Sequence, residues 1–93
     1  MKSLLSDDRE CLVCHTTVNL HRHHIYFGAG RRKISEKWGC WCYLCGRHHN
    51  RSDQGVHFDR SLDLELKQRC QSAWEQKNGT TEDFIRIFGR NYL

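Results

Sequence analysis

The chain has 93 residues, a formal net charge of +4 and six cysteines, and 38% of its residues are hydrophobic. A chain of this length forms one small domain at most, and its core usually needs support from disulfides or bound metal. The first residues contain two leucines followed by charged side chains, which does not fit a signal peptide or a membrane span. We therefore expect a cytoplasmic protein without a membrane partner.

The N-terminal two thirds of the chain predict two strands. Residues 1–10 form a polar lead-in, and residues 11–15 form a tight turn between two thiols. Aromatic, aliphatic and alternating side chains predict a strand over 18–27 and a second strand over 40–44. The basic stretch at 31–37, between the two strands, is either a loop or a short helix.

The C-terminal third of the chain mainly predicts helices. A polar turn or single helical turn over 47–53 precedes a helix that Asp59 or Ser61 caps and that reaches about Lys77. Thr80 is the expected cap of a last short helix. This order indicates one α+β domain with three successive parts: a polar lead-in at 1–10, a core at 11–60 and a C-terminal helical cover at 61–93.

The cysteine spacing predicts a structural zinc site. Cys11 and Cys14 form a Cys-x-x-Cys pair, and two sulfurs at this spacing can reach one tetrahedral zinc ion. Cys45 belongs to the second half of the site. Its partner is either Cys42, which completes a second Cys-x-x-Cys pair, or His48, which completes Cys-x-x-His. Such pairs beside many histidines favour metal binding over a disulfide framework. A zinc with four protein ligands would contribute folding free energy.

The histidines predict a second, chemically active metal site. Five of the seven fall in two short segments: His21, His23 and His24, and then His48 and His49. Adjacent histidines on a strand point to opposite faces, so one can bind a metal while its neighbour faces a substrate. This arrangement suits hydrolysis of a phosphodiester, in which a neutral imidazole takes the proton from the attacking water.

Basic side chains accompany both histidine segments. Arg31, Arg32 and Lys33 follow the first segment, and Arg51 follows the second. Phosphate contacts supply most of the non-specific affinity for nucleic acid, so these charges suit a polyanionic substrate. We expect the four side chains to hold neighbouring phosphates, which fixes the position of a nucleic acid but does not read its sequence.

The histidine motifs resemble those of the HNH endonucleases. The resemblance rests on His23-His24-Ile25, on a strand ending in Leu44-Cys45 and on His48-His49-Asn50. It is closest to small phage and prophage HNH proteins and covers roughly residues 11–77. It implies a ββα-metal core stapled by a structural zinc, with the C-terminal helices packed on that core. It also implies an endonuclease acting on DNA, with double-stranded DNA as the expected substrate, that uses one divalent ion: Mg²⁺, Mn²⁺, Ni²⁺ or Zn²⁺.

The resemblance also implies a role for individual residues. The second histidine of the first motif is the general base, which makes it His24, and the first histidine is a metal ligand, which makes it His23. The histidine after the second zinc-ligand pair binds the same ion, and this is His49. His57 is the candidate third ligand of that ion. In the register of the family, His48 is favoured as the fourth ligand of the structural zinc.

One departure from the family pattern concerns its middle asparagine, which ties the loop between the strands and the helix. That asparagine would fall near Cys40 or Trp41, and Asn50 lies beyond the second strand. The sequence therefore leaves the bracing of the loop unexplained.

Two other classes of protein account for part of the pattern. A non-catalytic zinc module that binds nucleic acid explains the thiols and the basic residues, but it has no use for the histidines together. A small structural or assembly protein with metal affinity explains the histidines without any substrate. The apolar residues Trp74, Phe84 and Phe88 suit a homodimer interface as well as a core, and a domain this small can depend on phage partner proteins for targeting.

Overall fold

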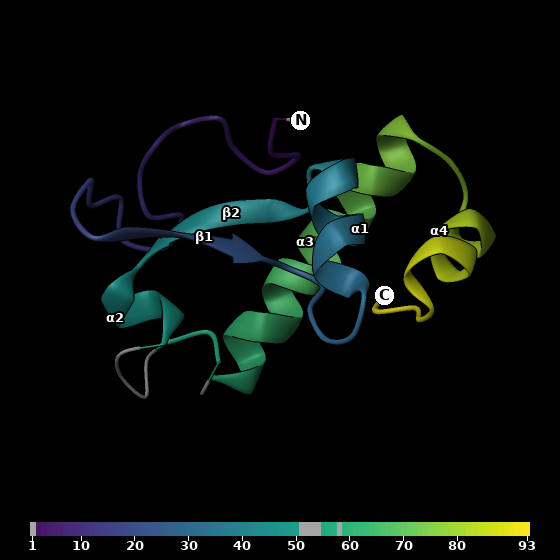
Figure 1. The fold of residues 1–93 in the computed structure, drawn as a ribbon. Coiled ribbons are helices and arrows are strands. Elements are labelled where there is room, and N and C mark those ends of the chain that lie inside the picture. The colour runs from purple at the N-terminus through teal and green to yellow at the C-terminus, as the bar shows by residue number, and fades with distance from the viewer. Residues whose placement is uncertain (1, 51–54, 58) are drawn as a thin grey trace.

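Two short antiparallel strands lie at the centre of the fold (Figure 1). The computed structural model describes residues 2–50, 55–57 and 59–93. Strand β1 spans Leu20–His24 and strand β2 spans Trp41–Cys45. The two strands pair over their full length, with His24 opposite Trp41 at one end of the sheet.

Both strands differ from their predicted bounds for local reasons. The first strand begins at Leu20 and not at residue 18, because Asn19 has a positive φ of 54° that interrupts the extended backbone. It ends at His24, opposite Trp41, the first residue of the partner strand. Strand β2 lies one residue further along the chain than the predicted range 40–44.

Helix α1 (Arg31–Trp38) connects the two strands, where the sequence allowed either a loop or a short helix. Gly30 and Gly39 have φ angles of 78° and 73° at its two ends, in the region that favours glycine. The buried Ser35 hydroxyl donates to the carbonyl oxygen of Tyr26 at 2.7 Å and accepts from the N–H of Tyr26 at 3.1 Å. These two hydrogen bonds tie α1 to the chain that leaves β1.

Three further helices follow β2: α2 (Gly46–His49), α3 (Arg60–Lys77) and α4 (Thr81–Phe88). Asp59 caps α3, because its carboxylate accepts from the N–H groups of Ser61 and Leu62. Of the two predicted caps for this helix, Asp59 is therefore the one used. Thr80 caps α4, as the sequence predicts, and it forms a reciprocal capping box with Asp83.

Aromatic side chains from α3, α4 and the end of β1 form the main core. Trp74, Phe84 and Phe88 are each at most 1% exposed. The Tyr26 ring packs against Phe84 and Phe88 with centroid distances of 5.4 and 4.9 Å, and its hydroxyl donates to the carbonyl oxygen of Lys67 at 2.7 Å. The apolar residues of the C-terminal helices thus pack inside a single chain.

The N-terminal residues lie against β2 and α1 in Figure 1. The N–H of Leu4 donates to the carbonyl oxygen of Gly39 at 2.9 Å, and the N–H of Leu12 donates to that of Tyr43 at 2.9 Å. The second bond docks the predicted thiol turn on the outer edge of the sheet. The result is a small α+β fold. Across the described ranges, none of the helices has the length and apolar character needed to cross a membrane.

Candidate metal centres

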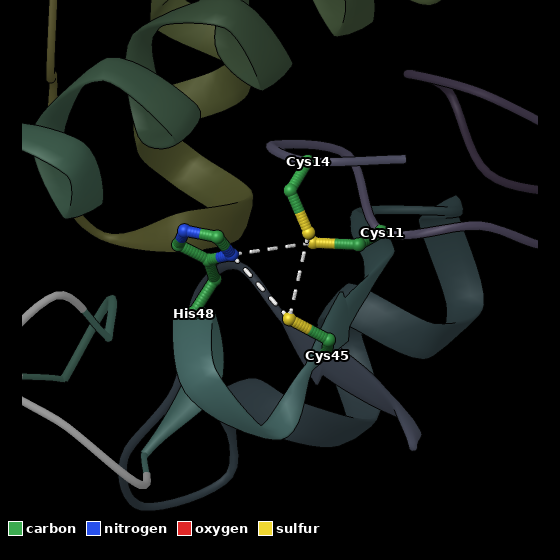
Figure 2. Close-up of side chains that lie close together, drawn as sticks. All are labelled: Cys11, Cys14, Cys45 and His48. Carbon is green, nitrogen blue, oxygen red and sulfur yellow. Dashed lines mark hydrogen bonds between the residues drawn. The ribbon is translucent and has the colours of Figure 1, made fainter. Parts of the chain in front are cut away.

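Three thiols and one imidazole converge at the end of the sheet that carries α2 (Figure 2). The ligand atoms of this thiol cluster, Cys11, Cys14, Cys45 and His48, all lie within 4.8 Å of one another. His48 Nδ1 lies 3.4 Å from the sulfur of Cys45 and 3.7 Å from that of Cys11. The sulfurs of Cys14 and Cys45 are 3.7 Å apart.

These distances match a tetrahedral metal site. Zinc–sulfur bonds are about 2.3 Å long, and tetrahedral geometry then places two sulfur ligands about 3.8 Å apart. The Cys14–Cys45 separation is 3.7 Å, which is close to that value. The thiol cluster is therefore compatible with a structural metal ion.

Local structure explains how the four ligands meet. In the turn that starts at Cys11, the N–H of His15 donates to the Cys11 carbonyl oxygen at 2.8 Å, and His15 has a positive φ of 65°. This conformation turns Cys14 back toward Cys11. Cys45 is the last residue of β2, and His48 lies one turn later on α2, so both side chains face the same point.

The ionisation of the thiols also fits a bound cation. Burial raises the pKa of Cys11, but backbone N–H groups, including those of Cys14 and Cys45, outweigh it and bring the pKa from 9.0 down to about 6. At Cys14 the N–H of Thr16 lowers the pKa, whereas desolvation and the neighbouring thiols raise it, and the net pKa is raised. A thiolate thus disfavours ionisation of the neighbouring thiol, because the two negative charges repel each other. A bound cation would offset this repulsion.

Cys42, the alternative fourth ligand, lies outside the thiol cluster. Its side chain is buried in the hydrophobic core. Burial is the main cause that raises the pKa of its thiol to about 12, with smaller contributions from Cys70 and Cys11. A protonated thiol is a poor metal ligand, because the thiolate is the form that binds. Of the two candidates, the structure brings His48 to the other three ligands.

A second group of side chains, the histidine cluster, consists of His23, His49 and His57, whose ligand atoms lie within 4.8 Å of one another. Nε2 of His49 and Nε2 of His57 are 3.2 Å apart. Zinc–nitrogen bonds of about 2.0–2.1 Å in a tetrahedral site place two nitrogens about 3.4 Å apart, which is close to this distance. The three residues come from β1, from α2 and from the chain that returns after α2.

Gly55 lets that returning chain approach α2. The N–H of His57 donates to the carbonyl oxygen of His49 at 3.3 Å, and the N–H of Val56 donates to that of His48 at 2.7 Å. A Cβ atom at Gly55 would lie only 2.8 Å from the carbonyl oxygen of His49. Only glycine therefore fits this contact without a backbone shift, and the contact places His57 beside His49.

Two imidazoles of the histidine cluster, those of His23 and His49, have lowered pKa values that favour the neutral form, which binds metal. Burial, followed by the neighbouring His49 and His57, lowers the pKa of His23 from 6.5 to about 3. Burial, followed by His57 and His21, lowers the pKa of His49 to about 4. Within the described part of the chain, the buried Nε2 atom of His23 has no hydrogen-bond partner. A neutral ring with an unsatisfied buried nitrogen fits a metal ion, since a bound ion would supply the missing partner.

His21, to which the sequence assigned no role, contacts this cluster. Its Nδ1 lies 2.9 Å from Nδ1 of His49, while the other nitrogen of His49 faces His57. A histidine that binds metal usually donates its second ring N–H to a nearby acceptor, which fixes the ring. The signal was present in the sequence, because His21 lies two residues before His23 and hence on the same strand face.

A cavity of about 390 Å³ adjoins the histidine cluster. Its walls include His23, His49 and His57, together with His24 and Arg32. The candidate base and the candidate metal ligands therefore border one space large enough for part of a nucleotide.

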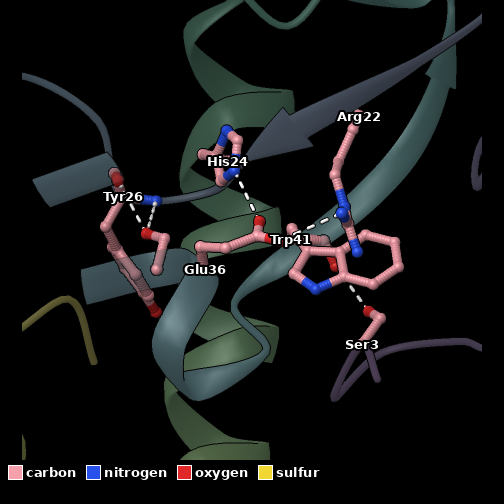
Figure 3. A network of polar contacts seen from close by, with 7 residues as sticks. Ser3, Arg22, His24, Tyr26, Glu36 and Trp41 are labelled. Carbon is pink, nitrogen blue, oxygen red and sulfur yellow. Dashed lines mark hydrogen bonds and ion pairs between the residues drawn. The ribbon is translucent and has the colours of Figure 1, made fainter. Parts of the chain in front are cut away.

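Glu36 of α1, to which the sequence assigned no role, contacts the candidate base. Figure 3 shows its carboxylate directed at His24, and its Oε2 lies 2.7 Å from Nε2 of His24. The two residues are 12 positions apart, so their contact depends on how α1 packs beside β1.

The predicted phosphate contacts fall in different places. Arg32 lines the cavity of the histidine cluster, and Lys33 lines an adjoining cavity that also contains His24 and Glu36. The guanidinium of Arg31 instead lies close to Gly89, at the C-terminal end of α4, where a cation is favoured by the helix dipole. Arg51 lies outside the described residues.

The chain matches no protein-family model, and no curated protein or solved structure shows significant similarity to it. The functional argument therefore rests on the geometry of the two clusters and the cavity.

Proposed function

We propose that this protein is an endonuclease of the HNH type that hydrolyses phosphodiester bonds of double-stranded DNA with the help of one divalent ion. The observation that carries the proposal is the histidine cluster with His24 on the wall of the same cavity. Three imidazoles grouped around one point, beside a separate imidazole, provide an ion site and a base next to one substrate-sized space.

The order of elements supports a ββα-metal core. β1 carries His23 and His24 next to each other, and β2 leads directly into α2, which carries His49. The antiparallel pairing brings the end of β2 beside the start of β1, so α2 lies at the same end of the sheet as His21.

Ser35 supports the loop that the middle asparagine braces in the HNH family. Its side chain makes both hydrogen bonds with the backbone of Tyr26, and its carbonyl oxygen accepts from the N–H of Cys40 at 2.8 Å. The connection between the strands therefore has its own bracing, although no asparagine stands at Cys40 or Trp41.

The chemistry divides between the ion and the side chains of the cavity. A divalent ion held by His23, His49 and His57, whether Mg²⁺, Mn²⁺, Ni²⁺ or Zn²⁺, would stabilise the negative charge that develops on the phosphate and the leaving 3′ oxygen. His24 takes the proton from the attacking water through the lone pair of a ring nitrogen. Arg32 holds a phosphate next to the cut bond.

The thiol cluster has a structural role in this proposal. Cys11, Cys14, Cys45 and His48 would supply all four ligands of a tetrahedral zinc, which would leave no position for a substrate. Such a zinc joins the N-terminal turn to β2 and α2, and its binding free energy contributes to folding.

The test is plasmid cleavage by the purified protein after EDTA treatment and after Mg²⁺, Mn²⁺ or Ni²⁺ is restored. We expect metal-dependent nicking or linearisation that His24→Ala abolishes, without a change in metal content or in the circular dichroism spectrum. His15→Asn is the matched control, because His15 is exposed, lies outside both clusters and has a positive φ that asparagine tolerates. DNA that is shifted on a gel but never cut would favour the non-catalytic binding module, and cleavage by His24→Ala would exclude His24 as the base.

A further inference from the structure

Three side chains form a chain of contacts that ends at the candidate base (Figure 3). Nε2 of His24 lies 2.7 Å from Oε2 of Glu36, and the other carboxylate oxygen, Oε1, lies 2.9 Å from the guanidinium of Arg22. The guanidinium of Arg22 in turn stacks over the ring of Trp41 at 3.6 Å from its centroid.

We propose that Glu36 is a positioning residue that sets the tautomer and the ring orientation of His24. The inference rests on the proposed function, because it assumes that His24 is the base. It adds a residue from α1, the connection between the strands, to a site otherwise built from β1, α2 and the chain after α2.

The tautomer follows from the chemistry of the contact. An ionised carboxylate only accepts hydrogen bonds, so the nitrogen of a neutral imidazole that faces it must carry the proton. In the neutral form of His24, Nε2 is therefore the N–H donor, and Nδ1 has the lone pair. Figure 3 shows the second ring nitrogen of His24 on the side of the ring away from Glu36. A base that must accept a proton from water needs a free lone pair of this kind.

Arg22 limits the motion of Glu36. The carboxylate is held between a cation on one oxygen and an imidazole N–H on the other, which leaves it little freedom to rotate. Stacking on Trp41 restrains the guanidinium in turn. Arg22 and His24 are two positions apart on β1, so their side chains lie on the same face of the sheet. Glu36 of α1 reaches both side chains from this face.

The position of Glu36 on α1 is also held firmly. The preceding residue, Ser35, is fully buried and makes two hydrogen bonds with the backbone of Tyr26. The side chains of His24 and Glu36 are 16% and 42% exposed, and ion pairs as exposed as this one add little to stability. Orientation of the imidazole is therefore a better explanation for the contact than stabilisation of the fold.

The experiment combines steady-state cleavage with NMR of the imidazole nitrogens. For Glu36→Ala we expect kcat to fall at least about 10-fold, the usual effect of losing an orienting partner, and up to about 10⁴-fold if the wrong tautomer dominates. KM should change much less, because in this proposal Glu36 acts through His24 and has no role in holding phosphate. Glu82→Ala, at an exposed position of α4 remote from the cavity, is the matched control and should keep the wild-type kcat.

Long-range nitrogen–proton spectra of the ¹⁵N-labelled protein report the tautomer, with the His24 signals identified by their loss in His24→Ala. We expect Nε2–H in the wild-type protein and a mixture of tautomers in Glu36→Ala. An unchanged kcat in Glu36→Ala, or an unchanged His24 tautomer, would overturn the inference while leaving the proposed function standing. A wild-type protein that does not cut DNA would instead overturn the proposed function, and the NMR comparison would still decide whether Glu36 sets the protonated nitrogen of His24.

Discussion

The environment of His23 bears directly on whether the histidine cluster can bind a metal ion. It is one of few polar side chains in the core, being 2% exposed, and its buried Nε2 has no partner among the described residues. An unsatisfied buried nitrogen is costly, and burial keeps the ring neutral by lowering its pKa to about 3. The same features that make His23 unfavourable in a metal-free core make it suitable as a ligand.

His21 leads to a prediction at the scale of the residue. Removing the partner that orients a ligating histidine typically lowers metal affinity about 10- to 100-fold. We expect His21→Ala to weaken Ni²⁺ binding by this factor in isothermal titration calorimetry, since imidazole ligands suit Ni²⁺ and the His21 contact orients His49. The His15→Asn variant should bind Ni²⁺ like the wild type. Equal affinity in His21→Ala would show that the His21–His49 contact does not support the ion.

At the scale of the element, the short helix α2 links the two clusters. It spans only Gly46–His49, yet His48 faces the thiol cluster and the adjacent His49 faces the histidine cluster. Consecutive residues on a helix point about 100° apart, so one helical turn can serve two separate sites. Correct placement of α2 is therefore needed for both.

Gly55 provides the prediction at this scale. Gly55→Ala introduces a Cβ atom 2.8 Å from the carbonyl oxygen of His49, and the returning chain must shift to avoid it. Because this shift moves His57 away from His49, we expect affinity for the second metal ion to fall about 10-fold or more. Elemental analysis should still find one tightly bound zinc per chain, since the thiol cluster does not include this segment. Wild-type affinity in the variant would mean that His57 is not a ligand.

At the scale of the whole molecule, two supports hold the fold together. The aromatic core of Tyr26, Trp74, Phe84 and Phe88 unites α3 and α4 with the end of β1. The thiol cluster brings together side chains from the N-terminal turn, β2 and α2. Helix α2 lies at the other end of the sheet (Figure 1). A domain of this size has limited apolar area to bury, so we expect the end of the sheet that carries α2 to depend most on bound metal.

A pair of cysteine variants tests this division. Cys14 is exposed, so Cys14→Ser removes almost no buried surface but deletes a proposed zinc ligand. We expect it to lose tightly bound zinc and to unfold at a lower temperature than the wild type. Cys42→Ala removes a buried core thiol instead, and it should lower stability through packing while retaining one zinc per chain. Zinc retained in Cys14→Ser, or lost in Cys42→Ala, would contradict the ligand set of the thiol cluster.

Several features were accessible from the sequence because they depend on neighbouring residues. The turn between Cys11 and Cys14, the cap at Asp59 and the capping box at Thr80 each involve residues within a few positions, whose hydrogen bonds form wherever the element lies. The grouping of His23, His49 and His57 was also predicted, through the resemblance in their motifs.

Other features were decided only when the chain folded. His48 lies in the thiol cluster, whereas the side chain of Cys42 lies in the core. The sequence could not distinguish them, because each lies three positions from Cys45. The contacts of His21 with His49 and of His24 with Glu36 join residues 28 and 12 positions apart. Such contacts depend on the path of the backbone between the partners, here set by the strand register and by Ser35. Local patterns determine which side chains are available for chemistry, and the tertiary structure determines which of them meet.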